Sequence, residues 1–381
     1  MKIVADENIP LLQPFFGSMG EIHTLPGREI SNEHLRDADV LLVRSVTKVD
    51  ERLLENTGVK FVGSATIGCN HVDMDYLTSR GVGFSNAPGC NASAVVEYVV
   101  SCLSVLSEQL GFELEDKTVG IIGRGEIGGR LERALTLLGL EVKSNDPPRE
   151  AAGEQNLFSL EEVLQCDIIT LHTPLTDSGP YPTRGLLNAA MIENLRSDQI
   201  LINTCRGEVI DEAALKGRLQ RGDGLTVALD VWNNEPAIDV ELAMLCHFAT
   251  PHIAGYTLDG RTAGTEIIYQ HLSRYLGLPV RHKLGQFLPE PPLRRMAFSS
   301  GVDPDWALHT AIRASYDVRH DDSQLKRTLR LDAPMRAQEF DRLRREYRVR
   351  RGFDRIKIEL KGGKADLLAT LSAVGFNLSS K

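Results

Sequence analysis

The chain has 381 residues, 42% of them hydrophobic and 25% charged, and its formal net charge is −9 at pH 7. This composition is that of a globular protein with enough apolar residues for two or three domains, and the acidic balance argues against general binding to nucleic acid or to anionic membrane surfaces. The N-terminus MKIVADENIP shows no signal peptide, no uninterrupted apolar run reaches membrane-spanning length, and the six scattered cysteines form no CxxC pair, so we expect a cytoplasmic protein with reduced thiols.

The N-terminal part of the chain alternates short apolar runs with helical patterns. Three runs predict strands (IVAD, DVLLVRS and KFVGSA), and two patterns predict helices between them (DERLLENTG and MDYLTSRG). Such alternation is typical of a parallel sheet with helices on its faces. The next pattern, ASAVVEYVVSCLSVL at 92–106, is apolar almost all round and predicts a buried helix.

A second series of strands and helices begins at residue 117 and ends near PHIAG. Its predicted strands are KTVGIIG, EVKSND, DIITLHT, QILINT and TVALDVW, and a helical pattern follows each of the first four. Repeated βα winding of this length predicts a doubly wound dinucleotide-binding domain. Residues 258–284 return to a helical pattern, and the prolines of FLPEPPLRRM indicate a linker. Arginine-rich helical patterns such as EFDRLRREYRVRRGFDR, the strand candidate IKIEL and a last helix then predict a small third domain.

The stretch VGIIGRGEIGG at 119–129 carries Gly123, Gly125 and Gly128 in a G-x-G-x-x-G array. Because the array follows an apolar strand and opens a helix, it predicts a dinucleotide site. Gly123 permits the tight turn, Gly125 lets the pyrophosphate approach the backbone, and Gly128 lets the helix pack on the sheet. The helix N-terminus offers unpaired N–H groups, those of Glu126 and Ile127, to the phosphates.

Asp146 ends the next predicted strand, 18 residues after Gly128. A carboxylate at this position accepts hydrogen bonds from the adenosine ribose and repels a 2′-phosphate, which favours NAD over NADP. Arg149, three residues further on, weakens this preference slightly.

Three further motifs follow predicted strands: NTCRGEVID (203–211), ALDVWNNEP (228–236) and TPHIAG (250–255). Strand ends on the carboxyl edge of an open α/β sheet lie together, so Arg206, Glu235 and His252 are expected to converge. Oxidation of a secondary alcohol needs a base for the hydroxyl proton, and histidine titrates near neutral pH. A carboxylate beside the ring stabilises its protonated form, and an arginine binds a substrate carboxylate with two parallel hydrogen bonds.

These motifs resemble those of the D-isomer-specific 2-hydroxyacid dehydrogenases over about residues 1–285. The resemblance implies an α/β protein with a Rossmann-type NAD-binding domain (94–257) inserted in a flavodoxin-like substrate-binding or lid domain (1–93 and 258–285). It also implies that a small α+β domain (286–381) forms a homodimer. In this family Arg206 would bind the carboxylate and the C2 oxygen, Glu235 would pair with His252, and His252 would be the acid/base. The remaining cofactor contacts would come from Thr173, Cys205, Asp230 and Gly255.

Within this family the closest resemblance is to members that oxidise a four-carbon hydroxy acid, phosphorylated at one end, in vitamin B6 biosynthesis. It is carried by MKIVADENIP, LLVRSVTKVD, FVGSATIGCNHVD and HIAGYTLDGRTAGT. The expected substrate-binding residues are Arg44, Ser45, Thr66 and Tyr256. Arg44 and Ser45 also occur in phosphoglycerate dehydrogenases, so they indicate a phosphorylated acid without choosing one. Turn capping remains an alternative for Ser45 and Thr66, and packing between domains remains one for Tyr256.

Other functions stay open at this point. A phosphoglycerate dehydrogenase is the nearest alternative, and a NAD-sensing corepressor is an alternative of another class. No metal is expected, because His71, Asp73 and Asp75 lack a fourth ligand and Asp73 serves equally as a helix cap. The C-terminal arginines alternate with acids and indicate a solvated or salt-bridged dimer surface rather than a nucleic-acid site, although one of them could reach a substrate phosphate: Arg342, Arg344, Arg345, Arg348, Arg350 and Arg351.

Overall fold

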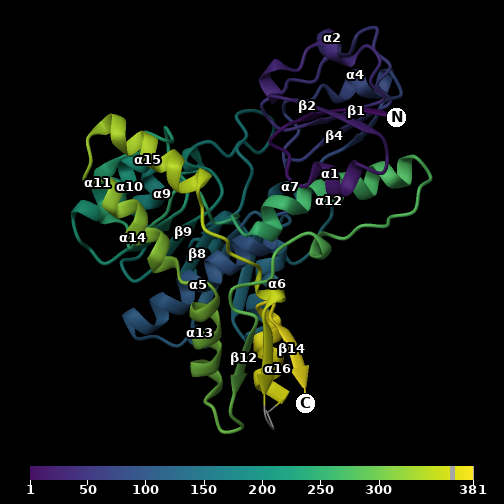
Figure 1. Ribbon diagram of the computed structural model, residues 1–381. Coiled ribbons are helices and arrows are strands. Elements are labelled where there is room, and N and C mark those ends of the chain that lie inside the picture. Colours follow the sequence, from purple (N-terminus) through teal and green to yellow (C-terminus); the bar gives the residue numbers. More distant parts are fainter. Residues whose placement is uncertain (361–364, 381) are drawn as a thin grey trace. The chain divides into compact units, whose positions relative to one another are not determined.

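The computed structural model describes residues 1–360 and 365–380 (Figure 1). The chain divides into two compact units, and each unit joins two separate stretches of the sequence. The first unit consists of Met1–Asn91 with Thr257–Glu290, and the second of Ala92–Tyr256 with Pro291–Lys381. In this division the C-terminal residues, from Pro291 on, belong to the same unit as the predicted dinucleotide-binding residues.

Five parallel strands form the sheet of the first unit, in the order β2-β1-β3-β4-β5. They are β1 (Lys2–Asp6), β2 (Glu21–Leu25), β3 (Val40–Val43), β4 (Phe61–Ser64) and β5 (Gly83–Ser85). This is the strand order of flavodoxin-like sheets, so the predicted topology is confirmed. The apolar runs predicted β1, β3 and β4. The sequence analysis missed β2, which has no buried residue, and β5, which has only three residues.

Short helices connect these strands, and one long helix comes from the second stretch of the chain. The short ones are α1 (Leu12–Phe16), η1 (Gly27–Glu29), α2 (Asn32–Leu35), α3 (Glu51–Leu54) and α4 (Met74–Ser79). A further short helix, η4 (Leu284–Gln286), follows the long helix. The long helix α12 (Leu258–Tyr275) begins after Thr257, whose hydroxyl oxygen accepts a hydrogen bond from the Gly260 N–H at 2.9 Å. Its Ile268 and Leu272 are buried in one apolar cluster with Phe61 of β4, so this helix completes the core of the first unit.

The second unit contains a six-stranded parallel sheet in the order β11-β10-β9-β8-β6-β7. The strands are β6 (Thr118–Ile122), β7 (Glu141–Asn145), β8 (Ile168–Leu171), β9 (Ile200–Asn203), β10 (Thr226–Leu229) and β11 (Phe248–Ala249). The chain passes from β6 to β7 on one side and then to β8 on the other side of β6. The winding direction therefore reverses between β6 and β8, and ligands of open α/β sheets bind at the carboxyl ends of the strands at such a point.

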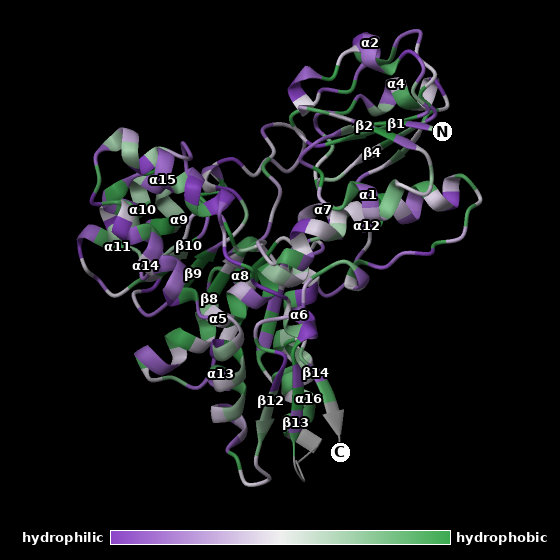
Figure 2. Ribbon diagram, viewed as in Figure 1, coloured by the Kyte–Doolittle hydropathy of each residue, from purple (hydrophilic) through white to green (hydrophobic). Residues whose placement is uncertain are grey.

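Helices cover this sheet, and strands buried on both faces explain the apolar runs seen in the sequence (Figure 2). The helices are α5 (Ala92–Leu110), η2 (Leu114–Asp116), α6 (Gly128–Leu137), α7 (Pro147–Ala151), α8 (Leu160–Val163), α9 (Ala189–Glu193), η3 (Gly207–Val209), α10 (Glu212–Gln220) and α11 (Val240–Leu245). Gly120 of β6 lets α8 lie close to the sheet, because a Cβ there would be 2.5 Å from the Val163 carbonyl oxygen.

Helix α5 is buried along most of its length, as its apolar pattern predicted. By length and composition alone it is long and apolar enough to cross a membrane, although polar residues interrupt its apolar sequence. However, 78% of its most apolar 18-residue stretch is buried inside the protein, as in the core helix of a folded domain. Its Tyr98 and Leu103 belong to the large apolar cluster of the second unit.

The C-terminal stretch adds a three-stranded parallel sheet and four helices to the second unit. The strands are β12 (Arg295–Phe298), β13 (Lys357–Leu360) and β14 (Asn377–Ser380), in the order β12-β13-β14. The helices are α13 (Pro304–Ser315), α14 (Val318–Thr328), α15 (Ala333–Arg345) and α16 (Ala365–Ala373), with η5 (Phe353–Arg355) between α15 and β13. Figure 1 shows α13 beside α5, and the two helices share the large apolar cluster.

The boundary between the two units falls inside the stretch interpreted as a linker, FLPEPPLRRM, after Glu290. Only its last two residues belong to β12, where Arg295 and Met296 pair with Lys357 and Ile358 of β13. One expectation for this part of the chain was wrong. The helical pattern of EFDRLRREYRVRRGFDR ends at Arg345 in the structure. The chain then leaves the helix and buries Arg350 and Arg351, so these two arginines are not part of a solvated surface.

Candidate active site

The three glycines of the G-x-G-x-x-G array have different environments in the loop between β6 and α6. Gly123 has φ +94°, and a Cβ there would lie 2.8 Å from the His172 carbonyl carbon. A Cβ on Gly128 would lie 2.0 Å from the Gly123 carbonyl oxygen. By contrast, a Cβ on Gly125 would meet no protein atom within 4 Å. The loop thus needs glycine at 123 and 128 for its own packing and at 125 for a ligand that approaches the backbone, which is the pattern that a pyrophosphate requires.

The N-terminus of α6 fits the phosphates of such a ligand. No side chain caps this helix at Ile127, so its first N–H groups point toward the loop without a side-chain acceptor. A cavity of about 490 Å³ opens over the same loop, and its lining includes Gly125, Glu126 and Arg130. The residues present therefore fit a bound dinucleotide.

Asp146 directly follows β7 and faces this loop. Its Oδ2 accepts a hydrogen bond from the Arg124 N–H at 2.8 Å, and its Oδ1 accepts one from the Arg149 N–H at 3.2 Å. The carboxylate therefore joins the glycine loop to α7 and still has lone pairs for ribose hydroxyls. The Arg124 and Arg149 guanidinium groups are both held by Glu154, at 2.6 and 3.0 Å, so neighbouring acids already neutralise them. This arrangement supports the prediction of NAD over NADP.

His172, at the carboxyl end of β8, is a buried neutral histidine. Its Nε2 lies 2.9 Å from the Thr170 hydroxyl and its Nδ1 lies 3.1 Å from the Thr204 hydroxyl. Burial lowers the pKa of His172 to about 3, so this ring carries no charge at neutral pH and is not an acid/base candidate. Its neighbour Thr173 turns its hydroxyl toward the Cys205 Sγ, 3.8 Å away.

The predicted acid/base pair is in direct contact. His252 Nδ1 lies 2.8 Å from Glu235 Oε2, and the other carboxylate oxygen accepts a hydrogen bond from the Trp232 N–H at 3.0 Å. Because the carboxylate is an acceptor, Nδ1 carries the ring proton and Nε2 is the ring nitrogen with a lone pair that can accept a proton. The His252 side chain is 30% exposed, which leaves it accessible to a ligand.

Asp230 holds the loop that carries His252. Its Oδ1 accepts hydrogen bonds from the Thr250 hydroxyl at 2.6 Å and the Ile253 N–H at 2.8 Å, and its Oδ2 accepts one from the Ala254 N–H at 2.9 Å. The backbone carbonyl of Asp230 accepts a further bond from the His252 N–H at 2.7 Å. Burial raises the pKa of this carboxyl. A contact of Asp230 with the cofactor stays a prediction, because its carboxylate oxygens serve the loop.

Arg206 lies at the carboxyl end of β9 with an exposed side chain. Its Nη1 donates a hydrogen bond to the Cys205 carbonyl oxygen at 2.6 Å. The next residue, Gly207, lies against the backbone after β10, since a Cβ there would be 2.1 Å from the Trp232 carbonyl carbon. The ends of β9 and β10 are thereby held together, which places Arg206 beside the loop that contains Glu235.

The Cys205 thiol is a poor candidate for a nucleophile. It is buried and donates to Asn203 Oδ1 at 3.0 Å, and burial raises its pKa. This environment argues against a catalytic role for the thiol.

The predicted substrate residues fall in both units. In the first unit, Arg44 and Ser45 follow β3; the Arg44 guanidinium is half-buried and has no partner among the described residues, and Ser45 is exposed. The Thr66 hydroxyl lies 2.7 Å from the Ser64 hydroxyl and donates to the Gly68 carbonyl oxygen at 3.0 Å, which is a turn-capping arrangement. In the second unit, the half-buried Tyr256 packs its ring edge-to-face against Tyr347, with centroids 5.8 Å apart.

The three residues considered for a metal do not form a site. His71 Nε2 lies 2.9 Å from the Ser64 hydroxyl, and Asp73 caps α4 by accepting a hydrogen bond from the Tyr76 N–H at 2.9 Å. No cluster of three or more histidine, cysteine or acidic side chains suited to a metal occurs within residues 1–360 and 365–380.

Glu212 is a site residue that the sequence did not reveal. Its Oε1 accepts a hydrogen bond from the Asn233 N–H at 2.8 Å, two residues before Glu235. Burial, reinforced by Asp239, Glu208 and Glu235, raises the pKa of Glu212 to about 7. An acid in the first turn of a predicted helix is common, so only its burial against the Asn233 backbone distinguishes it.

Comparisons with known proteins agree with this fold. Residues 103–254 match the family model of the D-isomer specific 2-hydroxyacid dehydrogenase, NAD binding domain, and residues 287–375 match a domain of unknown function (DUF3410). Among solved structures, D-lactate dehydrogenase from Aquifex aeolicus, complexed with NAD and lactic acid, has a TM-score of 0.54 and 24% identity and covers 73% of this chain and 96% of its own. The NAD-bound 3-phosphoglycerate dehydrogenase of Entamoeba histolytica has a TM-score of 0.56 and 27% identity and covers 76% of this chain and 99% of its own.

The chain belongs to the class of D-isomer-specific 2-hydroxyacid dehydrogenases. The full-length relatives define the branch of this class. An erythronate-4-phosphate dehydrogenase from Hahella chejuensis is 97% identical over 381 residues, which is 100% of both chains. One from Marinobacter nauticus is 52% identical over 382 residues, covering 99% of this chain and 100% of the relative. The chain is therefore a member of the erythronate-4-phosphate dehydrogenase family, and the predicted fold class and NAD as the cofactor are confirmed.

Substitution of the loop glycines should separate cofactor binding from folding. Gly125→Ala is expected to raise the Kd for NAD about tenfold or more, roughly 1.4 kcal/mol, because the added methyl enters the ligand's space. Its thermal stability should stay unchanged. Gly128→Ala is expected to lower the free energy of unfolding by about 1–3 kcal/mol, because the methyl meets backbone. Calorimetric NAD titration and thermal denaturation measure both effects.

The matched control is Gly217→Ala in α10, where a Cβ would meet nothing within 4 Å. This variant should bind NAD as the unsubstituted protein does and lose no stability. An unaltered Kd for NAD in Gly125→Ala would contradict the assigned role of that glycine.

The raised pKa of Glu212 predicts a pH-dependent stability. Since its pKa of about 7 lies above the ordinary value of 4.5, the folded state binds more protons than the unfolded chain between these values. The contribution of Glu212 to the free energy of unfolding is therefore largest below about pH 4.5 and is lost as the pH rises to 7. The change in the free energy of unfolding caused by Glu212→Gln, relative to the unsubstituted protein, should be more favourable at pH 8 than at pH 4.5 by about 1–3 kcal/mol. Urea unfolding at both pH values, with exposed Glu241→Gln as the control, measures the difference; equal shifts in both variants would refute it.

Proposed function

We propose that this chain oxidises 4-phospho-D-erythronate to (R)-3-hydroxy-2-oxo-4-phosphobutanoate with NAD, in the biosynthesis of vitamin B6 as pyridoxal or pyridoxine 5′-phosphate. The observation that carries the chemistry is the contact between His252 and Glu235 at the carboxyl edge of a sheet whose first loop fits a dinucleotide. The choice of acid is supported by the names of the full-length relatives, which are erythronate-4-phosphate dehydrogenases.

Three residues have separate roles in the proposed reaction: His252 transfers the proton, and Glu235 and Arg206 stabilise charge. His252 Nε2 takes the proton of the C2 hydroxyl while the C2–H bond breaks and a C=O bond forms. Bound NAD supplies the acceptor for the hydride. Glu235 holds the ring through Nδ1 and stabilises the positive charge that the ring acquires. Arg206, with its exposed guanidinium, binds the substrate carboxylate and polarises the C2 oxygen.

The substrate's ends would be recognised by Arg44, Ser45, Thr66 and Tyr256. Arg44 suits an anionic group because its guanidinium has no partner among the described residues. Ser45 and Thr66 offer hydroxyl groups, although the Thr66 hydroxyl also serves its own turn. Tyr256 offers a phenol close after His252. The contacts of its ring with Tyr347 also fit the packing alternative, so substitution has to decide its role.

We also propose that the enzyme is a cytoplasmic homodimer that pairs through the C-terminal residues 286–381. Large apolar side chains are exposed in this stretch, among them Trp306 at 57%, Val349 at 53% and Met335 at 44%. Apolar groups on such a surface favour contact with a second copy. Six free cysteines, four of them buried, suit a reducing compartment.

The substrate assignment is tested by NAD reduction with three acids side by side: 4-phosphoerythronate, 3-phosphoglycerate and unphosphorylated erythronate. We expect the highest kcat/KM for 4-phosphoerythronate, because four carbons and a phosphate match the proposed recognition of both ends. Preference for 3-phosphoglycerate would instead make the chain a phosphoglycerate dehydrogenase. Failure with every hydroxy acid would favour the alternative of a NAD-sensing binding protein, which needs the dinucleotide site but no turnover.

The role of His252 is tested by substitution with asparagine. His252→Asn should lower turnover by a factor on the order of 10²–10⁴, because the hydroxyl proton loses its acceptor. The Kd for NAD should stay within about twofold. Steady-state kinetics and NAD titration measure both quantities. His23→Asn, at an exposed histidine of β2, is the matched control and should leave turnover unaltered. Near-normal turnover in His252→Asn would remove His252 from the mechanism.

A further inference from the structure

A buried arginine lies in the C-terminal stretch, in the segment that follows α15. This segment, residues 346–352, forms neither helix nor strand. Arg350 within it is only 2% exposed. Burial of a guanidinium is costly unless other groups hydrogen-bond to it and balance its charge, so the partners of Arg350 show what the burial accomplishes.

The Arg350 guanidinium connects the C-terminal segment to the acid/base loop and to α5. Its Nη2 donates hydrogen bonds to the carbonyl oxygens of Ala94 at 2.8 Å and Ala254 at 3.2 Å. Its central carbon lies 3.9 Å from the ring centroid of Tyr316, and Glu97 Oε2 lies 3.7 Å from Nη2. The charge is therefore balanced, and one of its two hydrogen-bond acceptors lies two residues after His252.

The peptide groups that flank Ala254 are fixed from both sides. Its N–H donates to Asp230 Oδ2 at 2.9 Å, and its carbonyl oxygen accepts from Arg350 at 3.2 Å. Asp230 comes from the end of β10, whereas Arg350 comes from a segment about 120 residues further along the chain. The loop is thus held between a carboxylate and a guanidinium that act on opposite ends of one residue.

His252 needs such support because of its backbone conformation. Its backbone φ is +57°, in the left-handed region that residues other than glycine rarely adopt. Conformations of this kind are strained and persist only where the surrounding structure determines them. If the Ala254 carbonyl were released, the strain at His252 would favour a different loop conformation, and the ring would move away from Glu235.

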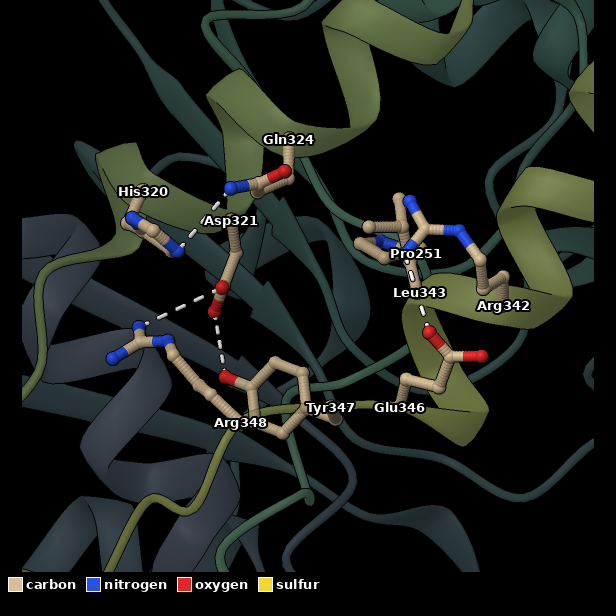
Figure 3. Close-up of a pocket in the computed structure, with 9 residues that line it drawn as sticks. All are labelled: Pro251, His320, Asp321, Gln324, Arg342, Leu343, Glu346, Tyr347 and Arg348. Atoms are coloured by element: carbon tan, nitrogen blue, oxygen red, sulfur yellow. Dashed lines mark hydrogen bonds and ion pairs between the residues drawn. The ribbon is translucent and has the colours of Figure 1, made fainter.

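The same C-terminal segment also contacts the loop at its other end. Figure 3 shows Pro251 beside Leu343 of α15, and Asp321 in reach of both Tyr347 and Arg348. The Tyr347 hydroxyl donates to Asp321 Oδ2 at 2.6 Å, which fixes the ring that packs edge-to-face against Tyr256. Ala254 and Tyr256 therefore both contact this segment, through Arg350 and Tyr347 respectively.

We infer that Arg350 is a positioning residue for catalysis: through the Ala254 carbonyl it holds His252 in the conformation in which the ring meets Glu235. The inference rests on the proposed role of His252 as the acid/base. It makes the C-terminal stretch part of the active-site framework in addition to any part it has in dimerisation. A displacement of a reacting group by about 1 Å can cost roughly 100-fold in rate, so the hydrogen bond of Arg350 matters for turnover more than for substrate affinity.

The test is a double-mutant cycle between Arg350→Met and His252→Asn in the full-length protein. Arg350→Met should lower kcat about tenfold or more, with KM changed less than about threefold. In the His252→Asn background the same substitution should change kcat by less than about twofold, because a positioning residue has no further effect once its target is absent. Steady-state kinetics with 4-phosphoerythronate and NAD give all four values.

Two further variants complete the test. Arg350→Lys keeps a cation that can donate to one carbonyl oxygen, so it should restore part of kcat relative to Arg350→Met; it also replaces the methionine variant in the cycle if that protein does not fold. Arg345→Met, at an arginine of α15 whose side chain is 67% exposed, should leave kcat unaltered. Equal losses of kcat in both His252 backgrounds, or no loss in either, would overturn the inference. Normal turnover in His252→Asn alone would contradict the proposed function instead.

Discussion

The carboxylate of Asp230 accepts three hydrogen bonds from the loop that begins at Thr250, and the acid/base geometry depends on these bonds. A buried carboxylate is unfavourable unless donors surround it, and here the loop supplies them. The loop in turn obtains fixed acceptors for N–H groups that would otherwise lack partners. This mutual requirement links the end of β10 to the backbone on both sides of His252, so the position of the histidine follows from the sheet.

The same requirement explains why the site residues come from widely separated motifs. Each strand of the second sheet brings one short motif to the carboxyl edge, and the next connection begins there. Arg206 follows β9, Glu235 follows β10 and His252 follows β11, so their order along the chain repeats the order of the strands in the sheet. Rigid strand ends place polar groups more reproducibly than long loops do, and hydride transfer needs such precision.

Much of this arrangement could be predicted from the sequence because its signals are local. The glycine array stands between an apolar strand and a helix and consists of Gly123, Gly125 and Gly128. The His252 motif likewise comes after an apolar run that predicts a strand, TVALDVW. The sequence could not reveal the partners of Arg350, because Ala94 and Ala254 contribute only carbonyl oxygens, which every residue possesses. The arginine-rich pattern even suggested a solvated helix, since the burial of Arg350 depends on contacts more than 90 residues away. Likewise, β2 and β5 are too exposed or too short for hydrophobic periodicity to identify them.

Each unit is built from two stretches of the chain that are separated by part of the other unit, and this affects folding during synthesis. The first unit obtains α12 only after the whole first stretch of the second unit has been made, and the second unit obtains Pro291–Lys381 last. Folding on the ribosome proceeds from the N-terminus, and a unit cannot complete its core before its last segment emerges. The nascent chain therefore exposes the strands of the first sheet without the helix that covers them, and the loop around His252 gains its contact with Arg350 only after that residue has emerged. The geometry of this loop would then be complete only in chains whose synthesis has passed residue 350.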